Sequence, residues 1–150
     1  MKDLTIDVGI LMTGSGIGNP DNSQSCNLLM KKTMATLNWC LALDKGGKIE
    51  NQYGTKLGQG TFGHHWLLQM ASRDKIKYVT WRSIDRGTIT QLKEAHFDKE
   101  DFKYVRTAEA TVCKIIVSHD PDYSNRIRRI LRRRLDVVVN DSEECLCIEQ

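Results

Sequence analysis

The segment KIIVSHDPDYSNRIRRILRRRL, residues 114–135, predicts a buried strand, a short polar turn and a helix rich in arginine. Its apolar run at 115–117 is typical of a strand that is covered on both faces. Apolar residues then recur at helical spacing from Ile127 to Leu135, with arginines on the remaining faces. A buried strand followed by an amphipathic helix indicates an α/β fold.

The turn between this strand and this helix carries two carboxylates, Asp120 and Asp122. They follow the carboxyl end of the predicted strand, which is where open α/β sheets bind their ligands. Ser118 is placed to fix Asp120 by a hydrogen bond, and we interpret His119 as a structural residue rather than a proton-transfer group. Asp122 either belongs to the site or caps the helix that follows.

Strand and helix patterns alternate along the rest of the chain and predict a single domain, residues 1–150. The further strands are expected at 4–11 (with Asp7 inside it), 76–81 and 136–140, with a short apolar segment at 41–43. The further helices are expected at 23–40, 49–57, 64–72, 90–95 and 97–110. These elements predict a three-layer sandwich with a mainly parallel central sheet, followed by an acidic tail at about 141–150.

Composition places the chain among ordinary globular proteins, with 40% hydrophobic and 27% charged residues. The five cysteines are odd in number and lack CxxC spacing, which argues against a disulfide framework and against a structural zinc site. No apolar run approaches the ~18 residues of a membrane span. The N-terminus also lacks the apolar region of a signal peptide, so we expect a cytoplasmic protein with no membrane contact.

Four acids from separate elements are expected to meet at the carboxyl edge of the sheet: Asp7, Glu50, Asp101 and Asp120. Carboxylates that share a site shift one another's pKa, and a divalent cation relieves that repulsion. Ligation by oxygen alone suits Mg²⁺ or Mn²⁺. Such an ion activates water and stabilises the charge that develops on a phosphodiester.

The arrangement of these acids resembles that of the PIN-domain ribonucleases. In that family a helix carries an acid, and about twenty residues later a strand ends in a Thr/Ser-x-Asp-x-Asp-aromatic tip; Asp101 and the segment IIVSHDPDYS are similar to this pattern. ALDKGGKIENQYGTKL resembles the family's D-x-x-G-x-I turn, which leads to an acid-Tyr pair. The chain departs from the pattern at Gln52, which stands directly before Tyr53 where the family has glutamate.

The resemblance implies a sheet in the order 3-2-1-4-5 and a metal-dependent endoribonuclease that cleaves single-stranded RNA, such as a toxin or a defence effector. It implies a Mg²⁺ or Mn²⁺ site, a homodimer and an inhibitory protein partner. The implied catalytic residues are Asp7, Glu50, Asp101 and Asp120. The implied metal ligands are Asp7, Asp101, Asp120 and Asp122.

The arginine-rich helix is the predicted RNA-binding element, through Arg126, Arg129, Arg132 and Arg133. Guanidinium groups bind phosphate in a bidentate manner, which an ammonium group does not. A charged helix face is often merely solvated, so this alternative stays open. An acidic protein, or the chain's own acidic tail, is the alternative partner for these arginines.

Two other functions remain open. One is a PIN-like module that binds RNA or protein without cutting, which Gln52 favours because it replaces the family's glutamate. The other is a doubly wound domain that binds a nucleotide or phosphate through the glycine loop at 13–18, although the glycines there do not match GxGxxG spacing.

Overall fold

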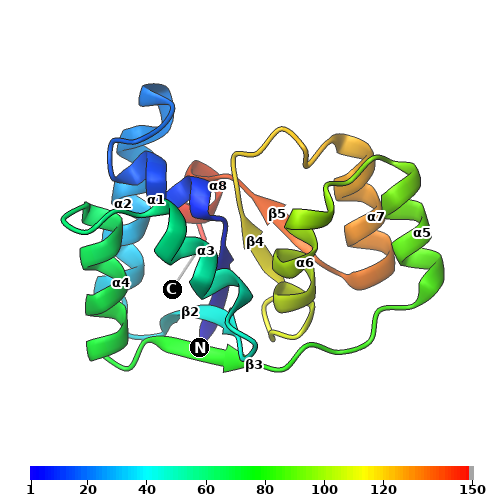
Figure 1. Cartoon of the computed structure of the whole chain (residues 1–150), viewed down its shortest axis with the longest axis horizontal. Coiled ribbons are helices and arrows are strands. Elements are labelled where there is room, and N and C mark those ends of the chain that lie inside the picture. Colours follow the sequence, from blue (N-terminus) through cyan, green and yellow to red (C-terminus); the bar gives the residue numbers. More distant parts are fainter. Residues whose placement is uncertain (149–150) are drawn as a thin grey trace.

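Five parallel strands form the centre of the computed structural model, which describes residues 1–148 (Figure 1). Their order in the sheet is β3-β2-β1-β4-β5. The strands are β1 (Lys2–Ile6), β2 (Trp39–Asp44), β3 (Ile76–Val79), β4 (Ile115–Val117) and β5 (Val138–Asn140). The α/β class and the strand order 3-2-1-4-5 are therefore confirmed.

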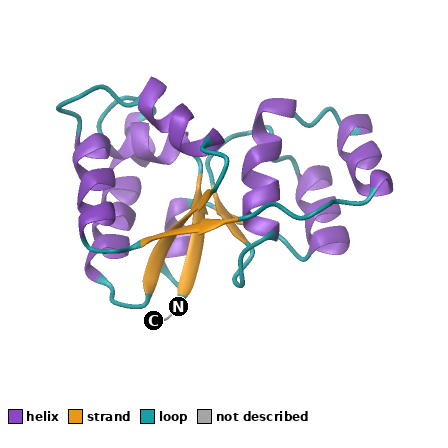
Figure 2. Cartoon of the chain, turned by 60° about the horizontal axis from the view of Figure 1, so that its bottom comes forward, coloured by secondary structure: helices purple, strands orange, loops and turns teal. Residues whose placement is uncertain are grey.

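Helices cover both sides of this sheet (Figure 2). α3 and α6 pack against β2 and against each other, whereas α2 packs against β2 and α8. α7 contacts β5 and α5. The α-helices are α1 (Val8–Gly14), α2 (Ser23–Ala35), α3 (Lys48–Lys56), α4 (Phe62–Ser72), α5 (Arg86–Glu94), α6 (Phe102–Glu109), α7 (Asn125–Leu135) and α8 (Ser142–Leu146). Two short 3₁₀ turns complete the structure, η1 (Pro20–Asn22) and η2 (Lys99–Asp101).

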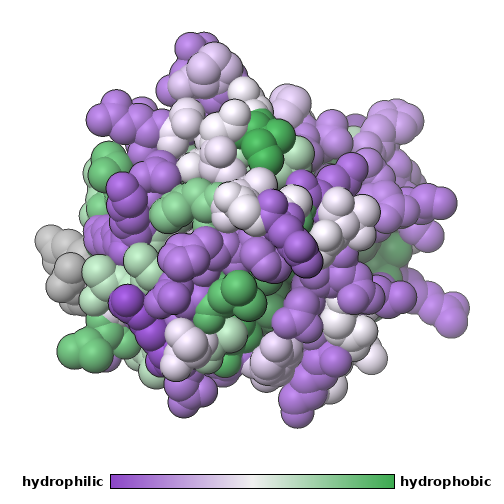
Figure 3. All heavy atoms as spheres, turned by 60° about the vertical axis from the view of Figure 1, so that its left-hand side comes forward, coloured by the Kyte–Doolittle hydropathy of each residue, from purple (hydrophilic) through white to green (hydrophobic). Residues whose placement is uncertain are grey.

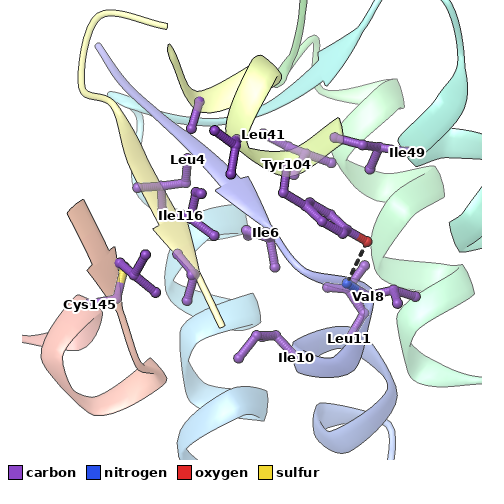
Figure 4. Packing of buried hydrophobic residues seen from close by; sticks show 14 of the residues in the cluster. Leu4, Ile6, Val8, Ile10, Leu11, Leu41, Ile49, Tyr104, Ile116 and Cys145 are labelled. Atoms are coloured by element: carbon purple, nitrogen blue, oxygen red, sulfur yellow. Dashed lines mark hydrogen bonds between the residues drawn. The ribbon is translucent and has the colours of Figure 1, made fainter. Parts of the chain in front are cut away.

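The hydrophobic core lies on both faces of the three inner strands, β2, β1 and β4. Leu4 and Ile6 of β1 and Ile116 of β4 are fully buried between the helix layers (Figure 4). All six residues of β2 are buried, as expected for a strand with neighbours on both sides and helices on both faces. The face that includes α2 and α4 shows apolar side chains scattered among polar ones (Figure 3).

Two predicted elements have the wrong bounds at the start of the chain. The strand predicted at 4–11 ends at Ile6, so Asp7 lies outside it and begins α1 as its N-terminal cap. The Asp7 side chain accepts a hydrogen bond from the Gly9 backbone N–H at 3.2 Å, which satisfies one of the free donors at the start of the helix. The helix predicted at 23–40 ends at Ala35, because the residues from Trp39 onward pair with β1.

The C-terminal region also differs from the prediction. The expected acidic tail contains the short helix α8, in which Asp141 and Glu144 form a reciprocal capping box. Residues 149 and 150 of that tail lie outside the described residues. Among residues 1–148, no helix combines the length and the apolar character that crossing a bilayer requires.

Candidate functional site

The carboxylates gather at the point where the strand order reverses. β1 lies between β2 and β4. The chain adds β2 and then β3 on one side of β1, and afterwards adds β4 and then β5 on the other side. Asp7 directly follows β1, and Asp120 lies three residues after β4. Ligands of open α/β sheets bind at this switch point, beyond the carboxyl ends of the strands.

The Ser118 hydroxyl connects the two acids that follow the central strands. It donates a hydrogen bond to Asp7 Oδ2 at 2.7 Å and accepts one from the Asp120 backbone N–H at 2.9 Å. The predicted link between Ser118 and Asp120 is therefore confirmed, and it extends to Asp7. Asp7 is only 7% exposed, and its burial raises its pKa despite these bonds, with a further contribution from the Asp120 charge.

Asp101 is the most strongly perturbed acid of the group. It lies at the start of α6 and is buried, and among residues 1–148 its carboxylate has no hydrogen-bond partner. Burial is the largest cause that raises its pKa from 3.8 to about 7, followed by the charges of Asp7 and Asp120. The carboxylates of Asp98 and Asp122 add to the effect. Asp101 therefore lies in a field that disfavours its ionised form.

Asp98, Asp101 and Asp122 form the tightest group of potential metal ligands. One carboxylate oxygen from each lies within 4.8 Å of the others. Asp122 does not cap α7, since Ser124 accepts the capping hydrogen bond. Its backbone N–H instead donates to Asp120 Oδ1 at 2.9 Å, which holds the two acids of the tip side by side. Asp98 lies within the helix predicted at 97–110, and no sequence pattern assigned it to the site.

Glu50 is the predicted site residue that the structure does not bring to this group. Its carboxylate accepts a hydrogen bond from the Tyr78 hydroxyl of the edge strand β3 at 3.0 Å. Gln52, in the same helix, accepts a hydrogen bond from the Tyr104 hydroxyl instead. Neither residue of α3 places a negative charge beside Asp101.

Tyr104 supports the start of α1, and no sequence pattern pointed to it. The residue is fully buried in α6, and its hydroxyl accepts a hydrogen bond from the Val8 backbone N–H at 3.1 Å (Figure 4). The same hydroxyl donates to Gln52, so three elements meet at this ring. Because Val8 follows Asp7, Tyr104 fixes the backbone that carries the buried acid.

His119 is bound on the α8 side of the sheet rather than to the acids. Its Nε2 atom lies 2.7 Å from the hydroxyl of Ser142, the first residue of α8. The neighbouring Ser142 hydroxyl also contacts Ser25 of α2 at 2.6 Å. This network connects the end of β4 to the helices behind it and supports the structural interpretation of His119.

The four arginines predicted to bind RNA are exposed on α7: Arg126, Arg129, Arg132 and Arg133. One of them, Arg132, forms an ion pair of 2.6 Å with Asp136. Arg128 instead anchors the helix to the sheet by donating to the Val139 carbonyl, and Arg134 binds the N-terminal cap of α5. The six arginines of the helix therefore divide into solvated and structural ones.

Two glycines of the glycine-rich segment allow close packing of the chain. Gly14 belongs to α1, and a Cβ atom there would lie 2.5 Å from Met30 Sδ and 3.2 Å from the Asn27 backbone nitrogen of α2. A Cβ atom at Gly18 would lie 2.5 Å from the Thr13 hydroxyl. Close contacts between chain segments explain these two glycines, so they give no support to a phosphate cradle.

The donor chemistry of the acidic group fits a hard divalent cation. All of its side chains offer carboxylate oxygens, which Mg²⁺ and Mn²⁺ prefer. Asp7 and Asp101 are buried beside further carboxylates, so a cation would relieve a repulsion that the fold itself imposes. Comparisons with family models, with curated protein sequences and with solved structures found no match for this chain. Its function is therefore inferred from its own residues.

Proposed function

We propose that this protein is a PIN-like, metal-dependent endoribonuclease that cleaves single-stranded RNA. The observation that carries the proposal is the position of the buried Asp101 at the switch point of the sheet, with one carboxylate oxygen within 4.8 Å of oxygens of Asp98 and Asp122. The neighbouring carboxylates, together with burial, raise the pKa of Asp101. Ionised carboxylates this close together repel one another and destabilise the metal-free protein at neutral pH. A bound divalent cation offsets that repulsion. The resemblance of the chain to PIN domains supports the choice of reaction.

Asp7, Asp101, Asp120 and Asp122 would hold the ion, and Asp98 lies close enough to Asp101 and Asp122 to contribute a further carboxylate. When bound, a Mg²⁺ or Mn²⁺ ion activates water and stabilises the charge of the phosphodiester being cleaved. Ser118 keeps Asp7 and Asp120 in a fixed relation through its two hydrogen bonds. Tyr104 holds the backbone next to Asp7. Sites held this rigidly lose little free energy to reorganisation during the reaction.

Cleavage of a labelled single-stranded RNA in Mn²⁺ tests the proposal, with Asp7→Asn and Asp120→Asn as the variants. We expect both to lose at least about 100-fold in rate, because each removes a charged ligand. Asp74→Asn is the matched control, since Asp74 is exposed before β3, at the opposite edge of the sheet. Cleavage that survives both Asp7→Asn and Asp120→Asn would refute the assignment.

A PIN-like module that binds without cutting is the second candidate, and a specific observation favours it. Glu50 is bound to Tyr78 and Gln52 to Tyr104, so α3 supplies no carboxylate to the group. Fewer ligands mean weaker metal binding. Isothermal titration with Mn²⁺ and an RNA-binding assay distinguish the two: RNA binding without detectable cleavage at saturating Mn²⁺ would establish the binding module.

A further inference from the structure

A basic pocket of about 380 Å³ adjoins the carboxylate group along α6. Four cations and two aromatic rings line it: Lys48, Lys99, Lys103, Arg106, Trp81 and Phe102. Glu100 is the single carboxylate of the lining. Small-molecule sites have volumes of roughly 300–1,000 Å³, so the pocket has room for one nucleotide unit. Its residues come from α3, from the segment after β3 and from η2 and α6.

We propose that this pocket binds one nucleotide of single-stranded nucleic acid, with its base stacked at Trp81 and its phosphate held by Arg106 and the lysines. The inference rests on the proposed function, from which it takes the class of substrate. The sequence placed the nucleic-acid strand along α7 alone, whereas this pocket places it along α6. Aromatic rings within a basic groove are the usual means of binding single strands, because every base offers a flat face for stacking.

Trp81 has the geometry of a fixed stacking platform. Its indole N–H donates a hydrogen bond to the Thr107 hydroxyl at 2.9 Å, which sets the orientation of the ring. Its side chain is half-buried, in contrast to Trp39 and Trp66, which are 1% and 0% exposed in the core. The guanidinium of Arg106 lies 5.8 Å from the centre of the Trp81 ring. A base that stacks at this ring would therefore have a phosphate-binding cation beside it.

The cations of the pocket are available to an external anion. Among residues 1–148, none of the four forms an ion pair with a carboxylate, whereas Arg132 and Arg134 of α7 both do. Unpaired charges around a hollow attract a polyanion and raise its local concentration. A protein partner with an acidic surface would use the charges but would not need the half-buried ring of Trp81.

The pocket is also positioned to present a strand to the acids. Asp101 lies between Glu100 and Phe102, and both of these line the pocket. Lys103 lines it too, and its charge acts on Asp7 by opposing the rise in pKa that burial causes. The Lys103 charge therefore acts both in the pocket and on the carboxylate group. A phosphate next to the stacked nucleotide would lie toward the carboxylates.

Two measurements in EDTA test the inference on the intact protein. The first is the quenching of intrinsic tryptophan fluorescence, which reports mainly on Trp81 because the two other tryptophans are buried. The second is the anisotropy of a labelled oligouridylate of about ten nucleotides. We expect quenching by oligouridylate and by oligothymidylate, weaker binding of duplex RNA of the same length, and no quenching by polyphosphate or polyglutamate.

Substitutions then locate the binding. Trp81→Leu and Arg106→Gln should each weaken oligouridylate binding about tenfold. Arg106→Gln should also lower the slope of log K against log salt by about 0.7, the value of one phosphate contact on a single strand. Arg73→Gln is the matched control, since Arg73 is exposed at the far end of α4. This variant should bind oligouridylate as the wild type does. A thermal melt checks that each variant is folded. If Trp81→Leu does not fold, Arg106→Gln still tests the pocket, because it leaves the Trp81 ring in place.

The outcomes separate this inference from the proposed function. No binding of oligouridylate, equal quenching by polyphosphate, equal binding of duplex RNA, or wild-type affinity in Arg106→Gln would each overturn the pocket. If RNA cleavage nevertheless depends on Asp7, the proposed function stands without it. Conversely, quenching that needs Trp81 and Arg106 in a protein that never cleaves RNA supports the pocket and overturns the nuclease.

Discussion

Replacing Asp101 with asparagine tests whether the carboxylates repel one another enough to favour a bound cation. A pKa raised from 3.8 to about 7 means that the folded protein binds this proton more tightly than the unfolded chain does. Since a tenfold change in proton affinity equals about 1.4 kcal/mol, the ionised group costs at most roughly 4 kcal/mol. Water reaches Asp98 and Asp122 on the outer side, so we expect screening to reduce this to about 2 kcal/mol.

The sign of the pH dependence follows from the same comparison. The unfolded carboxyl loses its proton near pH 4, whereas the folded one keeps it until about pH 7. The contribution of Asp101 to stability is therefore neutral below pH 4, becomes increasingly unfavourable as the pH rises to 7, and is constant above that. Asparagine has nearly the same shape and no charge, and no hydrogen bond of the carboxylate is lost within the described residues.

Thermal melts in EDTA at pH 4 and pH 8 measure the effect. Asp101→Asn should melt about 4–8 °C above the wild type at pH 8, and close to it at pH 4. Excess Mn²⁺ at pH 8 should raise the Tm of the wild type more than that of the variant, because binding to the folded state alone adds stability. Asp74→Asn should follow the wild type throughout. A variant that is equally or less stable at pH 8 in EDTA would refute the proposed repulsion.

Three further substitutions test the contacts that support the acids. Ser118→Ala removes the hydroxyl, leaves the Asp7 carboxylate and the Asp120 N–H without this partner, and should cost about 1–3 kcal/mol in urea unfolding; a loss below about 0.5 kcal/mol would show that water replaces the hydroxyl. Tyr104→Phe leaves the Val8 N–H and the Gln52 side chain without their partner and should cost a similar ~1–3 kcal/mol, with slower RNA cleavage as the second readout. Gln52→Glu adds a carboxylate at the position that now accepts the Tyr104 hydrogen bond, and it should tighten Mn²⁺ binding by about fivefold or more in calorimetry. An unchanged affinity would show that α3 lies too far from the bound metal to contribute.

The fold class was accessible from sequence because its signals are strong and local. The run at 115–117 is short and wholly apolar, and the arginines of α7 separate the buried from the exposed face of the helix. The end of β1 was not accessible, because VGIL continues the apolar run past Ile6 and such runs fit a strand or a helix equally well. The capping hydrogen bond that the Gly9 N–H donates to the Asp7 carboxylate favours the helix, and it exists only in three dimensions.

The site was predicted in its centre and missed at its edges for reasons of helix geometry. Successive residues of an α-helix are turned by about 100°, so Glu50 and Gln52 lie on different sides of α3 and find different tyrosines. In a 3₁₀ turn, side chains three residues apart lie above one another. η2 places Asp98 next to Asp101, and Asp122 of the distant tip completes the group, a contact that only the three-dimensional fold reveals.

The position of β1 also has a consequence for how the protein is made. β1 is synthesised before β2 and β4, yet it lies between them in the sheet, and the hydrogen bond between Asp7 and Ser118 spans 111 residues. A growing chain therefore exposes one unpaired edge of β1 until β4 has left the ribosome, and such edges invite aggregation. The carboxylates come together only after β4 and the turn that carries Asp120 have been synthesised, so a chain that stops before β4 has the first acid but no assembled site.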